Sequence, residues 1–168
     1  ESYNIPMEDM EQVIDNAINN GYSVAWGADV SENGFQYNKG VAVIPQTDVA
    51  VLNNAEQAKW TALTPKERES MFYNLDRPVV EQTITQKMRQ EAFDNYQTTD
   101  DHGMVIEGIA KDQRGEKFYI IKNSWNTDNV YKGYFYASRP FVQYKTMNIM
   151  VHKSAIPAEI LKKIGLSK

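Results

Sequence analysis

Apolar residues recur at helical spacing over residues 7–20 and 84–96, where steps of three and four place them on one face of an α-helix. Asn20-Gly21 supplies a stop for the first of these helices. A further helix is expected to begin at Thr64-Pro65 and to run to about residue 75, because a Thr cap, a Pro at the first position and a Glu at the third stabilise a helix start. A last helix is expected over residues 158–164.

Segments rich in β-branched and aromatic residues, bounded by turn residues, predict strands between and after these helices. They cover residues 22–26, 40–44, 102–109, 118–125, 133–136 and 145–152. Arg139-Pro140 is interpreted as a short turn between the last two strands. Helices come first and a strand-rich sheet follows, which indicates an α+β fold rather than alternating βαβ units.

The strands at 102–109 and 118–125 are expected to form one hairpin. A two-residue turn centred on Gln113-Arg114 would place Met104 opposite Asn123 and His102 opposite Trp125. His102 and Asn123 would then be diagonal neighbours on one face, at the backbone spacing of about 7–8 Å that side chains can bridge. A three-residue loop without a compensating bulge would instead place them on opposite faces.

Both faces of this hairpin carry apolar residues, which predicts a central strand pair that is covered on both sides. One face holds Ile106, Tyr119 and Ile121, and the other holds Val105, Ile109, Phe118 and Ile120.

The chain has 168 residues, of which 42% are hydrophobic and 24% charged, as expected for one globular domain. No apolar run is long enough to cross a bilayer, and the first six residues lack the basic and apolar regions of a signal peptide. We therefore expect no membrane partner and no secretory leader. The formal charge of −4 argues against a nucleic-acid partner. A cytoplasmic location is favoured, although exported bacterial domains can also lack cysteine.

One histidine and one asparagine carry the strongest chemical signal. His102 begins the hairpin, and Asn123-Ser124-Trp125 ends it. An asparagine oxygen that accepts the N–H of a histidine ring fixes the ring and leaves its other nitrogen as a general base for a cysteine nucleophile. Trp125, on the same face, is expected to cover that hydrogen bond against water. The chain contains no cysteine, so the nucleophile is missing.

Competing interpretations are weaker. Asp100-Asp101-His102 could ligate a metal, but adjacent strand residues point to opposite faces and no second histidine lies close in sequence. Residues 29–34 resemble the start of a calcium loop, yet Gly40 stands where that loop needs a bidentate Glu. We therefore expect no metal and no other cofactor. The tyrosines between residues 131 and 144 are interpreted as packing residues rather than a base-stacking surface.

The residues around His102 and Asn123 resemble two sequence motifs of a known family. His102-Gly103-Met104, followed by Tyr-Ile-Ile-Lys-Asn-Ser-Trp at 119–125, is similar to the histidine and asparagine boxes of papain-like cysteine peptidases. Residues 25–30 resemble the Trp-(Phe)-Gly-x-Asp-Val segment of the bleomycin hydrolase/aminopeptidase C branch. Residues 89–102 resemble that branch's Arg-x-x-x-Phe-Asp…Thr…Asp-His run. The similarity spans about residues 21–153 in matching order.

The resemblance implies a papain-like fold: residues 1–168 would be a single domain, the right-hand β-barrel portion with flanking helices, at the C-terminal end of a larger peptidase. It implies His102 as general base, Asn123 as its orienting partner and Trp125 as a supporting residue. The family's nucleophilic Cys lies on an N-terminal helical domain, which would be the partner that this chain lacks. The chain alone is therefore expected to be inactive, whereas the intact cysteine aminopeptidase would hydrolyse peptides and could form a homo-oligomer.

The alternative is a non-catalytic, peptidase-like binding or assembly module. The sequence upstream of Glu1 would discriminate, because an enzyme needs a Cys there and a module does not. Residues 161–168 do not resemble the terminal arm that some members place in the active cleft, so aminopeptidase and endopeptidase modes both stay open.

Overall fold

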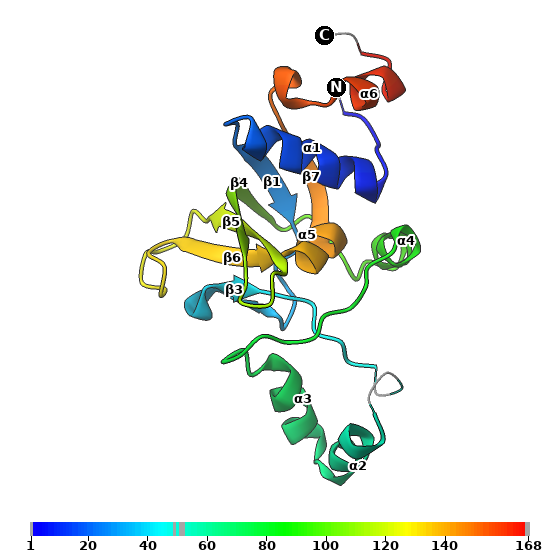
Figure 1. The fold of residues 1–168 in the computed structure, drawn as a ribbon, viewed down its shortest axis with the longest axis vertical. Coiled ribbons are helices and arrows are strands. Elements are labelled where there is room, and N and C mark those ends of the chain that lie inside the picture. Colours follow the sequence, from blue (N-terminus) through cyan, green and yellow to red (C-terminus); the bar gives the residue numbers. More distant parts are fainter. Residues whose placement is uncertain (1, 49, 51–52, 167–168) are drawn as a thin grey trace.

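Seven strands form one curled sheet in the order β2-β3-β6-β5-β4-β1-β7 in the computed structural model, which describes residues 2–48, 50 and 53–166 (Figure 1). All neighbouring strands are antiparallel except β3 and β6, which are parallel. The strands are β1 Val24–Ala28, β2 Phe35–Gln36, β3 Val41–Ala42, β4 His102–Lys111, β5 Lys117–Lys122, β6 Tyr134–Ser138 and β7 Thr146–Met150. The α+β class that the sequence predicts is confirmed.

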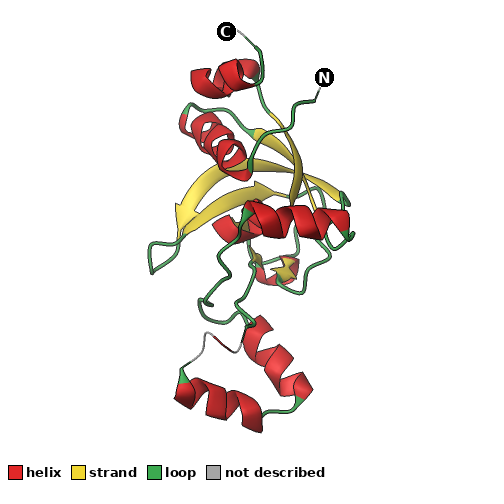
Figure 2. Ribbon diagram, turned by 90° about the vertical axis from the view of Figure 1, so that its right-hand side faces the viewer, coloured by secondary structure: helices red, strands yellow, loops and turns green. Residues whose placement is uncertain are grey.

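Helices flank the sheet and extend beyond it (Figure 2). They are α1 Met7–Asn19, α2 Asn54–Ala62, α3 Pro65–Tyr73, α4 Gln86–Asp94, α5 Arg139–Lys145 and α6 Ala158–Lys163, with 3-10 turns at Tyr37–Lys39 and Lys153–Ala155. The interpretation of Arg139-Pro140 as a turn is wrong, because Ser138 caps a helix there by accepting from the backbone N–H of Phe141 at 3.2 Å. Helix α2 lies in a segment for which the sequence predicts no helix. No helix in the described part of the chain is long and apolar enough to cross a membrane.

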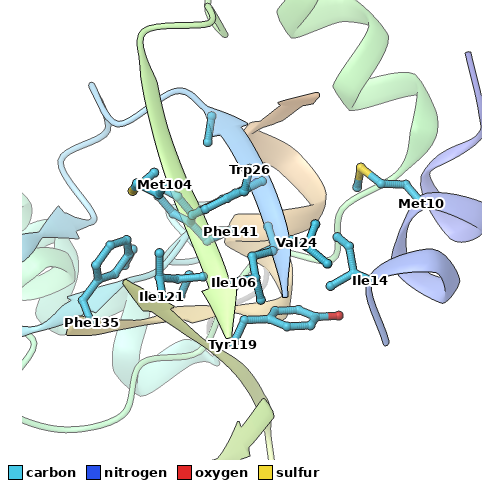
Figure 3. Packing of buried hydrophobic residues seen from close by; sticks show 14 of the residues in the cluster. Met10, Ile14, Val24, Trp26, Met104, Ile106, Tyr119, Ile121, Phe135 and Phe141 are labelled. Atoms are coloured by element: carbon cyan, nitrogen blue, oxygen red, sulfur yellow. The ribbon is translucent and has the colours of Figure 1, made fainter. Parts of the chain in front are cut away.

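The hydrophobic core lies between α1, α5 and one face of the sheet (Figure 3). The apolar face predicted for α1 is confirmed, because its residues are buried: Met7, Met10, Val13, Ile14 and Ala17. Met10 and Ile14 lie towards β1 and β4. Trp26 at the centre of β1 is 1% exposed and meets Phe141 of α5 edge to face at 6.4 Å. Burial of such side chains contributes about 1.5–3 kcal/mol each, so this face supplies most of the stabilisation of the fold.

The β4–β5 hairpin has a three-residue loop and a bulge. Lys111 pairs with Lys117, Asp112 N–H donates to Glu116 O at 3.0 Å, and Gly115 has a positive φ of 85°. The two-residue turn predicted at this point is therefore wrong. Glu107 is the extra residue of a β-bulge that shifts the register by one, so that Ile106 pairs with Ile121 as predicted. The bulge cancels the effect of the longer loop before the strands reach the histidine end.

The bulge also changes which side chains face the core. Ile109 pairs with the buried Tyr119 and packs against the core, although the sequence predicts it on the opposite face. On that opposite face, Val105, Phe118 and Ile120 are half-buried. The hairpin is central in the sheet, as predicted, but the prediction that both of its faces are covered is wrong.

Helices α2 and α3 form an arm, residues 46–83, that projects away from the sheet (Figures 1 and 2). None of its described side chains is fully buried, and Glu81, at the base of the arm, is half-buried. The two helices contact each other through Trp60 and Phe72, with ring centroids 4.6 Å apart, and through Arg68 over the Trp60 ring at 5.3 Å. The capping box predicted at Thr64 and Glu67 is confirmed, with both of its reciprocal hydrogen bonds formed. Local interactions therefore account for most of the arm's order.

The arm leaves and rejoins the sheet at one neck. Pro45 and Glu81 form a β-bridge there, and Gln46 N–H donates to Val80 O at 2.8 Å. The Glu81 carboxylate accepts from Ile44 N–H at 2.7 Å and from the Ser138 hydroxyl at 2.6 Å. Burial raises the pKa of Glu81 to about 7, although these hydrogen bonds and the charge of Arg114 act in the opposite direction.

Glu81 should therefore make the fold less stable as the pH rises. Above the ordinary pKa of 4.5, the unfolded chain has released a proton that the folded chain keeps until about pH 7. Glu81→Gln mimics the protonated form, so its gain in free energy of unfolding over the wild type should be larger at pH 8 than at pH 5, by about 1–3 kcal/mol. Urea unfolding at both pH values measures this difference. The exposed Glu159→Gln serves as a control, and an equal gain for Glu81→Gln at both pH values would contradict the assignment.

Candidate active site

His102 and Asn123 meet at one end of the sheet. His102 is the first residue of β4 and pairs with Ala28 of β1, and Asn123 directly follows β5. The ring Nε2 of His102 lies 2.7 Å from Oδ1 of Asn123. The same-face arrangement that the sequence predicts is confirmed, because the bulge at Glu107 restores the register on which it depends.

The hydrogen bonds around Asn123 fix the direction of this contact. Ser124 N–H donates to Oδ1 of Asn123 at 2.8 Å, and a backbone N–H can only donate, so the accepting atom is the amide oxygen. Nε2 of His102 must then carry the proton that it shares with Asn123. In the neutral ring, Nδ1 is consequently the basic nitrogen. It has no hydrogen-bond partner within the described residues, and the ring is half-exposed, so Nδ1 can exchange a proton with a reacting group.

The amide nitrogen of Asn123 is buried and has no hydrogen-bond partner among the described residues. Leaving a buried donor unsatisfied costs about 1–3 kcal/mol, which a smaller or apolar residue at position 123 would avoid. Asn123 is only 8% exposed, so solvent access does not remove this cost. A group kept at the expense of stability is typical of functional sites, and here the oxygen of the same amide orients the histidine.

Trp125 lies against the histidine ring. The two ring centroids are 4.8 Å apart at an interplanar angle of 33°. The other side of Trp125 meets Tyr37 and Phe35 edge to face, at 5.2 and 5.7 Å. The indole is 46% exposed, so it contacts the histidine and two aromatic rings while part of its surface remains open to solvent. Its position against the ring limits the movements of the imidazole, and its supporting role stays a prediction.

An open hollow of about 680 Å³ lies on the outer face of the sheet, and its lining includes Asn123 but not His102. Its lining includes Gly27 and Gly103: a Cβ at Gly103 would meet no atom within 4 Å, whereas a Cβ at Gly27 would lie 2.7 Å from the Asn148 side chain. Asn148 and Met150 of β7 form part of its wall, and Asn148 donates to the Asp100 carboxylate at 2.7 Å. Neighbouring strand residues point to opposite faces, so the His102 ring, which shares a face with the buried Met104, lies on the other side of the sheet from this hollow.

The possible metal ligands do not assemble. Asp100 and Asp101 instead accept hydrogen bonds from Asn148 and from Val30 N–H. Within the ranges that the structure describes, no group of three or more histidine, aspartate or glutamate side chains could hold a metal ion. Asp29, at the start of the calcium-like run, accepts from the backbone and hydroxyl of Ser31, which is a plain turn.

Fold and site together define a portion of a papain-like cysteine peptidase: a curled sheet that carries a histidine–asparagine pair at one end. The peptidase C1-like family matches residues 67–166, more than half of the chain. The chain belongs to this family.

Individual relatives agree with this assignment. Aminopeptidase C of Listeria innocua serovar 6a is 24% identical over 159 residues, which cover 95% of this chain and 30% of that protein. Aminopeptidase C of Listeria monocytogenes serovar 1/2a gives the same identity and coverage. The crystal structure of PepW from Lactobacillus rhamnosis HN001 superimposes with a TM-score of 0.59 at 20% identity, over 95% of this chain and 30% of that one. The chain thus spans less than a third of the length of the relatives that it matches.

Proposed function

We propose that this chain supplies the general base and its orienting amide to a cysteine aminopeptidase whose nucleophile lies elsewhere in a longer protein. The observation that carries this proposal is the 2.7 Å contact between His102 Nε2 and Asn123 Oδ1, with its direction fixed by Ser124. It leaves Nδ1 as the base. The names of the two Listeria relatives support the aminopeptidase class.

In the proposed reaction, Nδ1 of His102 takes the proton of the cysteine thiol, and the thiolate attacks the carbonyl carbon of a peptide bond. The imidazolium then gives this proton to the leaving amine as the C–N bond breaks, which leaves a thioester. Nδ1 next takes a proton from water, whose oxygen attacks the thioester, and the proton returns to the sulfur as the acid product leaves. Asn123 holds the ring orientation through both halves of the cycle. No cofactor enters these steps.

The partners that the proposal requires are thus a peptide substrate and the part of the protein that bears the cysteine. A homo-oligomer and a cytoplasmic location stay predictions.

The isolated 168-residue chain should show no peptide hydrolysis, because it contains no cysteine. The longer protein should release the fluorophore from an aminoacyl-coumarin substrate, and iodoacetamide should abolish this release by alkylating the nucleophile. Parallel assays of the two proteins, each with and without iodoacetamide, measure both outcomes. Hydrolysis by the isolated chain, or activity of the longer protein that survives alkylation, would contradict the proposal.

The lack of cysteine also favours a second candidate function, a peptidase-like module that binds or assembles without catalysis. In that case the longer protein would show no hydrolysis at all. Replacement of His102 would then leave its binding unchanged.

A further inference from the structure

The five residues that lead into His102 are tied to the body of the protein at every position. Lys145 Nζ donates to Gln97 O and to Thr98 Oγ1, both at 3.3 Å. Thr99 N–H donates to the Asp29 carboxylate at 2.9 Å. The carboxylates of the two residues that follow, at positions 100 and 101, accept from Asn148 at 2.7 Å and from Val30 N–H at 3.0 Å. Each residue of this loop segment therefore has a hydrogen bond to another part of the chain.

Lys145 is the centre of this arrangement. It is the last residue of α5, is 1% exposed, and pairs with Glu32 at 2.7 Å and with Asp29 at 4.0 Å. Its own carbonyl accepts from Asp29 N–H at 3.0 Å, so the two residues are joined by backbone as well as charge. Burial alone would raise the pKa of Asp29. The hydrogen bonds from Ser31 and Thr99 and the charge of Lys145 lower it by more than burial raises it, so the pKa is below its ordinary value. Asp29 is therefore ionised beside the buried ammonium.

A buried ion pair of this kind is weak evidence for a contribution to stability. Removing two charges from water costs about as much as their attraction returns, and apolar replacements of buried ion pairs are often neutral or stabilising. The pair does make oriented contacts with the segment before the histidine. Charge-assisted hydrogen bonds are short and directional, and here they join Lys145 and Asp29 to backbone and side-chain atoms of residues 97–99.

We propose that Lys145 and Asp29 are positioning residues for His102: by anchoring residues 97–101 they hold the ring at the place and angle at which Nε2 meets Asn123. Neither residue touches the reacting atoms. The consequence for catalysis rests on the proposed function, whereas the consequence for the ring does not. Because a displacement of about 1 Å can cost 10²-fold in rate, a small shift of this segment has a large chemical effect.

The first test follows the His102 ring in the isolated chain by 15N-resolved NMR. In Lys145→Met, the Nε2 proton that is shared with Asn123 should exchange with water about tenfold faster than in the wild type, because its hydrogen bond opens more often. Lys117→Met is the matched control: Lys117 also binds two carboxylates, those of Glu11 and Asp15 at 2.7 and 2.6 Å, but at the far end of β5. Its His102 signal should stay at the wild-type exchange rate. An unchanged rate in folded Lys145→Met would overturn the proposal.

A milder variant decides the matter if Lys145→Met does not fold. Thr98→Val removes one acceptor of Lys145 and keeps the shape of the side chain. It should increase the exchange rate of the same proton by a smaller factor. An unchanged rate in Thr98→Val together with unfolded Lys145→Met would also overturn the proposal, because the lysine would then serve stability alone.

The second test is catalytic and uses the longer protein. Lys145→Met should lower kcat by about 10- to 100-fold with KM unchanged, and Lys117→Met should leave both as they are. An active wild type whose kcat does not respond to Lys145→Met overturns the positioning role and leaves the proposed function intact. An inactive wild type, with the NMR difference present, refutes the proposed function and leaves the positioning of His102 by Lys145 established.

Discussion

His102→Ala in the longer protein is expected to lower kcat for peptide hydrolysis on the order of 10³- to 10⁶-fold. The loss is large because one nitrogen, Nδ1, serves each proton transfer of the proposed cycle. Alanine removes the base that makes the thiolate and the acid that protonates the leaving amine. KM should change much less, because the imidazole serves the proton transfers and not the binding of the peptide. Steady-state kinetics on an aminoacyl-coumarin substrate measure both constants.

The chain offers a matched control, since its second histidine is His152. This ring is exposed, stacks on Tyr22 at 5.3 Å and accepts from Ser154 N–H at 3.2 Å, beyond the end of β7 that lies away from the site. His152→Ala should leave kcat unchanged. A His102→Ala protein that keeps full activity would remove the histidine–asparagine pair from the mechanism and favour the binding module.

The largest effect on stability is expected for Trp26→Ala, about 3–5 kcal/mol in the free energy of unfolding. The indole is 1% exposed, packs on Phe141, and donates through Nε1 to Thr146 Oγ1 at 2.8 Å. Alanine would leave a cavity between β1 and α5 and an acceptor that has lost its donor. Because the free energy of unfolding of a small domain is only about 5–15 kcal/mol, the variant should be only marginally stable.

Urea unfolding of the isolated chain, followed by circular dichroism, measures this loss. Trp125→Ala removes the same side chain from a position that is 46% exposed, and it should cost far less than Trp26→Ala. Equal losses for the two variants would show that the packing around Trp26 is not the main source of stability.

Much of the fold could be predicted because its signals are local. The helix stripe of α1, the capping box of α3 and the β-rich runs of the hairpin are each visible within a few residues. Helix α2 could not be predicted in this way, because three of its four apolar residues are alanines, which form only a weak apolar face, and Trp60 finds its partner Phe72 in the next helix. Helix α5 resembles a turn in sequence because a proline stands in its first turn, where a helix tolerates it.

The same distinction between local and long-range signals applies to the candidate site. His102 and Asn123 could be predicted to meet, since a hairpin joins them over a short stretch of chain and the chemistry of the pair is specific. Lys145 could not be connected with them. Its partners Thr98 and Glu32 come from distant parts of the sequence, and a lone lysine after an apolar run gives no sign that it is buried. Long-range partners of this kind become visible only when the strands are assembled.

The bulge at Glu107 makes the two ends of the hairpin independent of each other. Its extra residue cancels the offset set by the loop at residues 113–115, so the alignment of the catalytic end is governed by the neighbouring strands rather than by the turn. Such an arrangement tolerates evolutionary change: a relative could gain or lose one loop residue together with the bulge and keep the same pair of side chains in contact. The length of this turn should accordingly be free to drift among relatives, while the spacing between His102 and the bulge is constrained by selection.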